Sequence, residues 1–215
     1  RRQRQMCIRD RAYMVQIAIM YLIAFELAFA RNKITKEECK KYTEYLENMP
    51  FVLEEAITLK EKCQYAASKL MNADSLLYIG RGLDYASSME GSLKLKEISY
   101  IHSEAFASGE LKHGTIALIS KGTPVIALMT QRYLAAKQIS NIKEVMSRKA
   151  EVITFAKKSL VTKDISCDFV LPEIDDDFTA VPSVVALQLL AYYVSSDKGL
   201  DVDKPRNLAK VVTVE

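Results

Sequence analysis

The segment SLLYIGRGLDYASSMEGSLKLKEIS, residues 75–99, joins a short apolar run to a glycine turn and then to a helical pattern. The run SLLYIG is continuous and short, which is typical of a strand buried on both faces of a sheet. Gly80 and Gly82 allow the backbone to turn tightly, and helical residues begin at about Tyr85. This order of strand, turn and helix predicts the opening of a βα unit.

The same alternation continues along the chain. Three further short apolar runs are TPVIALM at 123–129, EVITFA at 151–156 and DFVLP at 168–172. Helical patterns occupy residues 133–150 and 181–196. Strands that alternate with helices predict an α/β fold, a three-layer sandwich in which a mostly parallel sheet is flanked by helices on both faces. Because ligands gather at the carboxyl ends of such strands, the turn at Gly80–Gly82 is expected at the functional edge.

Composition excludes several classes of protein. The chain has 215 residues, 49% of them hydrophobic, with seven glycines and five prolines, so a sizeable folded core with long helices is expected. The net charge is +3, but the first eleven residues contribute +4 from five arginines and one aspartate, which leaves −1 for the remainder. The basic character is confined to one end, and we therefore predict no nucleic-acid partner.

The cysteines and histidines show no metal-binding pattern. Cys7, Cys39, Cys63 and Cys167 are widely separated and form no CxxC pair, so we interpret them as reduced thiols of a cytoplasmic protein. The two histidines form no HxH or HExxH arrangement, which predicts that no metal is bound. The single Gly-Arg-Gly turn lacks the remaining residues of a dinucleotide or P-loop fingerprint, and its simplest role is to turn the backbone.

The beginning of the chain is unusual. Residues 1–11, RRQRQMCIRDR, have no apolar period and resemble translated adapter sequence, so we interpret them as a non-native junction. The apolar run at 12–30 is too long for the core of a signal peptide, and Gln16 and Glu26 interrupt it as a membrane-spanning helix. We predict a buried amphipathic helix here, with no membrane partner. After it, Thr35 with Glu38 has the spacing of a capping box.

Charged residues form a stripe on the helix that follows Gly82. At about 100° per residue, Glu90, Lys94, Glu97 and Ile101 fall on one line, with Leu93 and Ile98 at its borders, whereas Lys96 points elsewhere. One interpretation is a surface ion pair between Glu90 and Lys94. The other is a site, which the βα context favours because charged and apolar faces normally separate on a surface helix. Lys96 is interpreted as a surface lysine.

Both histidines follow this helix. His102 lies close to its end, and His113 lies in GELKHG between Gly109 and Gly114, whose glycines permit unusual backbone angles. A lone histidine is often structural. The grouping of Lys94, Glu97 and His113 within twenty residues nevertheless makes a catalytic role an equally good interpretation.

The C-terminal segment DVDKPRNLAKVVTVE, residues 201–215, is rich in charge yet ends in an apolar run. A disordered tail would not usually end so apolar, so we predict that it docks on the protein, with Pro205 fixing its entry and Arg206 and Lys210 carried along. From the residues alone, docking for stability and docking over a site remain equally good alternatives.

Two long motifs carry a resemblance. Residues 89–114, MEGSLKLKEISYIHSEAFASGELKHG, and residues 181–215 closely resemble the C-terminal sugar isomerase (SIS) domain of the glutamine–fructose-6-phosphate aminotransferase (isomerising) family, also called glucosamine-6-phosphate synthases (EC 2.6.1.16). The resemblance runs from Ala12 to Glu215. It implies that residues 12–49 are the helical end of a first SIS domain with its linker, and that residues 50–215 are a second SIS domain with a C-terminal tail.

The resemblance also implies an activity. Family members are homodimers or larger assemblies that combine glutamine-derived ammonia with fructose 6-phosphate to give glucosamine 6-phosphate, with no metal or organic cofactor. By its motif, Glu97 is similar to the base that moves a proton between sugar carbons, and Lys94 to the lysine that stabilises charge beside it. His113 matches the ring-opening histidine, which the neighbouring subunit supplies. Lys210 matches the imine-forming lysine, and Ala209 lies beside the sugar.

The chain also departs from the family pattern. Thr115 and Val211 stand where the family usually has proline and serine. The family's phosphate loop belongs to the first SIS domain, whose STK would directly precede Ala12, and Arg9-Asp10-Arg11 stands there instead. The glutaminase domain has no counterpart here either. We therefore expect the 215-residue chain alone to have no synthase activity and little isomerase activity. Alternatives are a SIS-family sugar-phosphate deglycase or deaminase, and a non-catalytic sugar-phosphate-binding regulatory domain; the DKPRNLAK tail favours the synthase.

Overall fold

A computed structural model describes the backbone of residues 7–206 and the side chains of residues 13–206. Contacts divide the chain into two units, residues 1–54 and residues 55–215. The division falls within helix α3, Met49–Ile57. The two units are described separately.

The first unit is a helical hairpin. Helix α1 spans Cys7–Ala30, and helix α2 spans Lys36–Glu47. The predicted capping box is confirmed: the Glu38 backbone N–H donates to Thr35 Oγ1 at 3.1 Å, and the Thr35 N–H donates to Glu38 Oε2 at 2.7 Å. The ring of Phe25 in α1 stacks on that of Tyr42 in α2 with centroids 5.0 Å apart. Stacked aromatic rings and a capped N-terminus therefore fix the hairpin.

The prediction that the first helix is buried is wrong for the described part of the chain. Seven large apolar side chains of α1 are exposed, among them Met20 at 65%. The reason is a shortage of packing partners, since α2 is the helix that contacts α1. Residues 13–30 are long and apolar enough to cross a bilayer, as are residues 176–197, but the second segment is 67% buried. Core helices of soluble proteins meet the same criteria of length and hydropathy, so neither segment is evidence for a membrane-spanning helix.

The second unit is built on a parallel sheet. Its strands are β1 (Ser75–Gly80), β2 (His102–Ala107), β3 (Pro124–Met129), β4 (Glu151–Lys157) and β5 (Phe169–Leu171). Their order in the sheet is β2-β1-β3-β4-β5, and every neighbouring pair is parallel. The main helices are α4 (Lys60–Leu70), α5 (Leu83–Ser99), α6 (Ala135–Ser147) and α7 (Ala180–Asp197).

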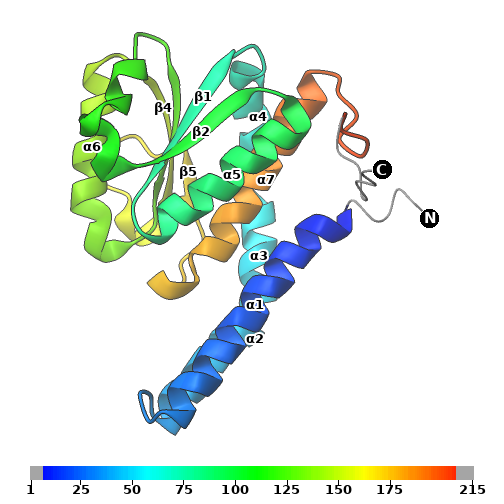
Figure 1. The fold of residues 1–215 in the computed structure, drawn as a ribbon, viewed down its shortest axis with the longest axis vertical. Coiled ribbons are helices and arrows are strands. Elements are labelled where there is room, and N and C mark those ends of the chain that lie inside the picture. The colour runs from blue at the N-terminus through cyan, green and yellow to red at the C-terminus, as the bar shows by residue number, and fades with distance from the viewer. Residues whose placement is uncertain (1–6, 207–215) are drawn as a thin grey trace, which may run out of the picture. The chain divides into compact units, whose positions relative to one another are not determined.

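Both faces of this sheet are covered, as Figure 1 shows, with α6 on one face and α4, α5 and α7 on the other. Alternate strand residues serve the two faces: Leu76 and Tyr78 pack in the cluster with α4, α5 and α7, whereas Leu77 and Ile79 pack in the cluster with α6. Continuous burial of strands follows from this double cover. The predicted three-layer α/β fold is confirmed.

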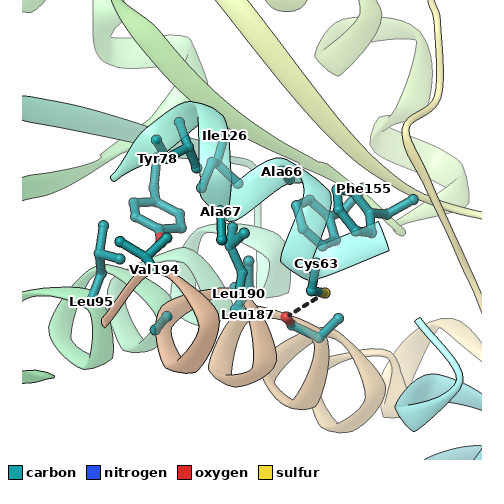
Figure 2. Close-up of a cluster of buried hydrophobic side chains, with 14 of the residues drawn as sticks. Cys63, Ala66, Ala67, Tyr78, Leu95, Ile126, Phe155, Leu187, Leu190 and Val194 are labelled. Atoms are coloured by element: carbon teal, nitrogen blue, oxygen red, sulfur yellow. Dashed lines mark hydrogen bonds between the residues drawn. The ribbon is translucent and has the colours of Figure 1, made fainter. Parts of the chain in front are cut away.

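Figure 2 shows the core beneath α4 and α7. Leu187 and Leu190 of α7 lie among the buried side chains of α4 and the sheet. Cys63 of α4 is fully buried, and its thiol donates to the Ala186 carbonyl at 3.6 Å. Burial raises the pKa of Cys63 to about 12, so this thiol stays protonated at neutral pH and acts as a packing residue.

Two secondary-structure predictions need correction. Strand β2 was not predicted, because HSEAFA has no continuous apolar run; it is an edge strand paired with β1 alone, so its side chains are less buried. The apolar periodicity between Pro50 and about Asn72 predicts one helix, but the structure has two, α3 and α4. The chain breaks at Thr58, whose hydroxyl donates to the Glu55 carbonyl at 2.6 Å.

Gly80 ends β1 where the backbone of α5 passes closest to it. A Cβ placed on Gly80 would lie 2.4 Å from the Asp84 carbonyl carbon and 2.6 Å from the Tyr85 nitrogen. These are backbone atoms of the first helical turn, so they cannot move aside without displacing α5. The turn from strand to helix therefore requires glycine at this position.

We predict that Gly80→Ala lowers the free energy of unfolding by about 3 kcal/mol, because overpacking against fixed backbone forces α5 off the sheet. Urea denaturation of the variant measures the loss. Gly109→Ala is the matched control, because the nearest atom to its new Cβ belongs to the flexible guanidinium of Arg81. Equal stability of the two variants would contradict the prediction.

Candidate active site

Helix α5 is held against the domain by its small residues. Ser87, Ser88, Gly91 and Ser92 are buried, and a Cβ on Gly91 would lie 2.6 Å from Leu187 Cδ1 of α7. Small side chains allow close approach of helix to helix and of helix to sheet. Burial of this face leaves the charged residues of α5 on another face of the helix.

Lys94 lies between two carboxylates on that face. Its Nζ is 3.0 Å from Glu97 Oε2 and 3.6 Å from Glu90 Oε1. The side chains are only 13%, 22% and 12% exposed for Lys94, Glu97 and Glu90 respectively. An ordinary surface pair is far more exposed, as the Lys40–Glu44 pair of α2 shows at 79% and 55%. The alternative of a solvated surface pair therefore does not fit, whereas Lys96 is exposed as predicted.

The stripe predicted from the sequence included one residue too many, Ile101. Helix α5 ends at Ser99, and Tyr100 has a positive φ of 61°, so Ile101 leaves the helix and is buried in the core. The stripe consists of Glu90, Lys94 and Glu97.

This charged group lies at the far end of the helix from the Gly80–Gly82 turn. At 1.5 Å per residue, Glu97 is about 21 Å along the axis from Leu83. Helix α5 runs back to the amino edge of the sheet, where β2 begins at His102. The expectation that α5 starts at the carboxyl edge is confirmed, but Lys94 and Glu97 are at the opposite edge.

His113 is separated from this group within the chain. It ends a short 3-10 helix, Ser108–His113, that follows the carboxyl end of β2, and its side chain is 74% exposed with Nε2 3.8 Å from Glu110 Oε2. The six residues of β2, about 20 Å of strand, lie between the two edges. Within one chain, Lys94 and Glu97 therefore lie together at the amino edge of the sheet, whereas His113 lies at the carboxyl edge.

The C-terminal segment returns to the end of α5. Pro205 is buried, and the Arg206 backbone N–H donates to the Tyr100 hydroxyl at 2.7 Å. The guanidinium of Arg206 lies over the Tyr100 ring, 4.2 Å from its centroid. The predicted docking of the tail is confirmed as far as Arg206. Ala209 and Lys210 lie outside the described residues.

The carboxyl edge of the sheet is occupied by a buried polar network that the sequence analysis missed. The Asp84 carboxylate accepts hydrogen bonds from the Thr130 backbone N–H, at 2.8 Å, and from the Thr130 hydroxyl. Thr130 Oγ1 lies 2.8 Å from Thr179 Oγ1, and the side-chain amide of Gln131 donates to Thr179 Oγ1 at 2.9 Å. These residues come from three separate segments, so no local motif marks them.

A buried ion pair extends this network. Lys157, at the end of β4, is fully buried, donates to the Ile174 carbonyl at 3.1 Å and pairs with Asp176. Desolvation opposes ionisation of Asp176, but the hydrogen bond and charge of Lys157 outweigh it, so the pKa of Asp176 is lowered. The protein's own side chains thus occupy part of the usual ligand edge of a parallel sheet.

In the described part of the chain no three His, Cys, Asp or Glu side chains gather in a way that could hold a metal ion. Cys39, Cys63 and Cys167 are free thiols.

The sequence profile of one domain family, the SIS domain, matches residues 69–195. The chain belongs to the SIS domain family. The match covers β1 to β5, α5, α6 and most of α7, and therefore includes Lys94, Glu97 and His113.

Relatives within this family are long proteins. The chain is 51% identical over 208 residues to the glutamine–fructose-6-phosphate aminotransferase (isomerising) of Clostridium acetobutylicum, and 49% identical over 207 residues to that of Caldanaerobacter subterraneus. Each match covers 95% of this chain but 34% of the relative. The SIS-domain chain thus corresponds to about a third of the length of these proteins.

Solved structures agree with this assignment. The C-terminal domain of glucosamine-fructose-6-phosphate aminotransferase from Francisella tularensis superposes with a TM-score of 0.79 at 35% identity, covering 85% of this chain and 52% of that one. A glucosamine-6-phosphate deaminase from Thermotoga maritima gives 0.62 at 26% identity, covering 89% and 55%. The first resemblance is stronger by both measures.

The buried carboxyl of Asp84 should make stability depend on pH. Burial raises its pKa to about 6, although the hydrogen bonds from Thr130 act in the opposite direction. An unfolded aspartate titrates near 3.9, so between about pH 4 and pH 6 the folded protein holds more protons than the unfolded chain. Its contribution to the free energy of unfolding, up to about 3 kcal/mol for two pKa units, is present below pH 4 and lost as the pH rises to about 6.

We predict that Asp84→Asn, which cannot titrate, reduces this decrease in stability between about pH 4 and about pH 6. Urea denaturation of both proteins across that range measures the difference. Asp74→Asn, at an exposed position just before β1, is the matched control and should keep the wild-type slope. Identical pH dependence in all three proteins would show that Asp84 does not titrate in this window.

Proposed function

We propose that this SIS domain is the isomerase part of a glutamine–fructose-6-phosphate aminotransferase, which converts fructose 6-phosphate and glutamine-derived ammonia to glucosamine 6-phosphate. The protein would act in the cytoplasm as a homodimer, without a metal or organic cofactor. Two relatives of that name share about half of their aligned residues with this chain. The chain spans a third of their length, so the remaining two thirds would supply glutamine hydrolysis and the phosphate-binding loop.

One observation supports this function above the others: the docking of the tail at the end of α5, the helix that carries Lys94 and Glu97. Tyr100 follows Glu97 by three residues and holds Arg206. Lys210 comes four residues after Arg206, and four extended residues span at most about 14 Å. We propose that this tether lets the tail lysine of the DKPRNLAK motif reach the charged group on α5. A regulatory sugar-binding domain has no use for this combination.

The shielded pair on α5 suits the chemistry. Moving the carbonyl from carbon two to carbon one requires a base that takes a proton from one carbon and returns it to the other, and Glu97 is the proposed base. Lys94, with its Nζ 3.0 Å from Glu97, is a cation that can stabilise negative charge developing on the sugar oxygens. Partial burial strengthens both effects because water screens them less.

Lys210 and Ala209 complete the proposed site from the tail. Lys210 would attack the keto carbon through its neutral amine and form an imine with loss of water. Nearby cations such as Arg206 and Lys94 would favour the neutral amine that this step requires. Ala209 would lie beside the sugar.

His113 would act in the site of the neighbouring subunit. Imidazole can both donate and accept a proton near neutral pH, as ring opening of the sugar requires. The exposure of His113 at the carboxyl edge, away from Glu97 of its own chain, suits a role across a dimer interface. A two-fold axis would then supply each site with Glu97 from one protomer and His113 from the other.

The function is tested by joining residues 12–215 behind the first two thirds of the Clostridium acetobutylicum relative. We expect this chimera to form glucosamine 6-phosphate from fructose 6-phosphate and glutamine, and the 215-residue chain alone to form none. Glu97→Gln should lower the rate of the chimera by at least about a hundredfold, because a positioned base contributes that much or more. Glutamine hydrolysis should be retained.

Lys96→Gln is the matched control, on the same helix but exposed, and should keep full activity. An inactive but folded chimera would reject the synthase. Release of ammonia from glucosamine 6-phosphate by that chimera, with no synthesis, would instead support a deaminase, in line with the Thermotoga maritima structure.

Shared sites are tested by mixing two inactive chimeras, Glu97→Gln and His113→Gln. If His113 acts across the interface, each mixed dimer holds one site with both residues intact. Random exchange then restores roughly a quarter of the wild-type activity, because half of the dimers are mixed and half of their sites are complete. If both residues served the same site from one chain, mixing would restore nothing.

A further inference from the structure

We propose that Tyr100 and Arg206 form a clasp that anchors the start of the C-terminal tail at the end of α5, and that this anchor serves catalysis. Neither residue is proposed to contact the sugar, and the family resemblance assigns no role to Tyr100. The proposal rests on the proposed function for its catalytic consequence. The clasp itself rests on contacts of the described residues.

The first half of the clasp is a tyrosine in an unusual backbone conformation. Tyr100 is the C-cap residue of α5, with φ 61° and ψ 12°, in the left-handed region that a bulky side chain rarely adopts. Glycine or asparagine fits such a position with less strain. A tyrosine here therefore indicates that its ring is needed, and the ring is where Arg206 binds.

The second half is the segment that enters from Pro205. Pro205 is buried, the Arg206 backbone N–H donates to the Tyr100 hydroxyl at 2.7 Å, and the Arg206 guanidinium lies 4.2 Å from the ring centroid. Two contacts with Tyr100, together with the burial of Pro205, thus hold two consecutive residues of the tail in place. A hydrogen bond to the backbone fixes the path of the chain as well as the position of the Arg206 side chain.

The position of the clasp gives it a function. Tyr100 is one residue beyond the end of α5 and three residues after Glu97, so a tail fixed on its ring is anchored at the end of the helix that carries the charged group. Without the clasp, Lys210 would be delivered by a freely moving chain. Holding a reacting group near its target removes much of the entropic cost of reaction, which predicts an effect of the clasp on kcat.

Docking is tested by limited digestion of the 215-residue chain with trypsin, which cleaves after Arg206 and releases a C-terminal peptide measurable by mass. Cleavage of a docked segment follows the population of its open form. Tyr100→Phe removes the hydroxyl and should raise the cleavage rate about fivefold, the factor expected for one hydrogen bond. Tyr100→Asn fits the left-handed backbone but removes the ring as well, and should raise the rate about twentyfold.

Tyr65→Asn is the matched control. Tyr65 also has a lysine over its ring, Lys69 at 4.4 Å, but it lies on α4 away from the tail, so its loss should leave cleavage at Arg206 unchanged. Wild-type cleavage as fast as that of Tyr100→Asn would overturn the clasp. So would an equal increase in the Tyr65→Asn control.

The catalytic consequence is measured in the chimera. Tyr100→Asn should lower kcat for synthesis about tenfold with KM for fructose 6-phosphate unchanged, because the clasp positions the tail and does not bind the sugar phosphate. Tyr100→Phe should recover most of that loss. Rapid cleavage in Tyr100→Asn with wild-type kcat would show that the clasp docks the tail without serving catalysis. An inactive wild-type chimera would reject the proposed function and leave the digestion result standing.

Discussion

The close approach of α5 to β1 and α7 is the constraint on which the rest of the domain depends. Gly80 lets the first turn of α5 pass within contact distance of the strand end, and Gly91 lets its middle lie against Leu187. Because this contact fixes the direction of α5, it also fixes where each charged residue lies. Asp84 is placed at the carboxyl edge of the sheet, and Lys94 with Glu97 is placed at the amino edge.

The two edges of the sheet have different chemistry. At the carboxyl edge, buried carboxylates, hydroxyls and Lys157 satisfy one another, so polar groups that could have bound a ligand serve to hold the ends of β3 and β4 to the start of α5 and to the segment that enters α7. At the amino edge, Lys94, Glu90 and Glu97 are shielded but remain partly exposed, and the described end of the tail docks on Tyr100 at the end of the same helix. The general rule for parallel sheets therefore locates the structural network here, and not the candidate active site.

The sequence predicted the layers well and the edges poorly. Continuous apolar runs identified β1, β3, β4 and β5, because strands covered on both faces cannot carry polar residues without cost. The apolar runs did not identify edge strand β2, because a strand with one unpaired side can carry polar residues at less cost. The same limit applies to α1: its apolar residues predicted burial, but the described partners of the first unit cover too little of it.

The sequence by itself determined the βα order, the shared face of Lys94 and Glu97, and the family, because each depends on residues close together along the chain. Only the tertiary structure decided that His113 lies away from Glu97, that Asp84 meets Thr130, and that Arg206 meets Tyr100. These contacts join residues up to 106 positions apart. Such contacts depend on how helices and strands pack against one another, so the spacing of residues along the chain does not predict them.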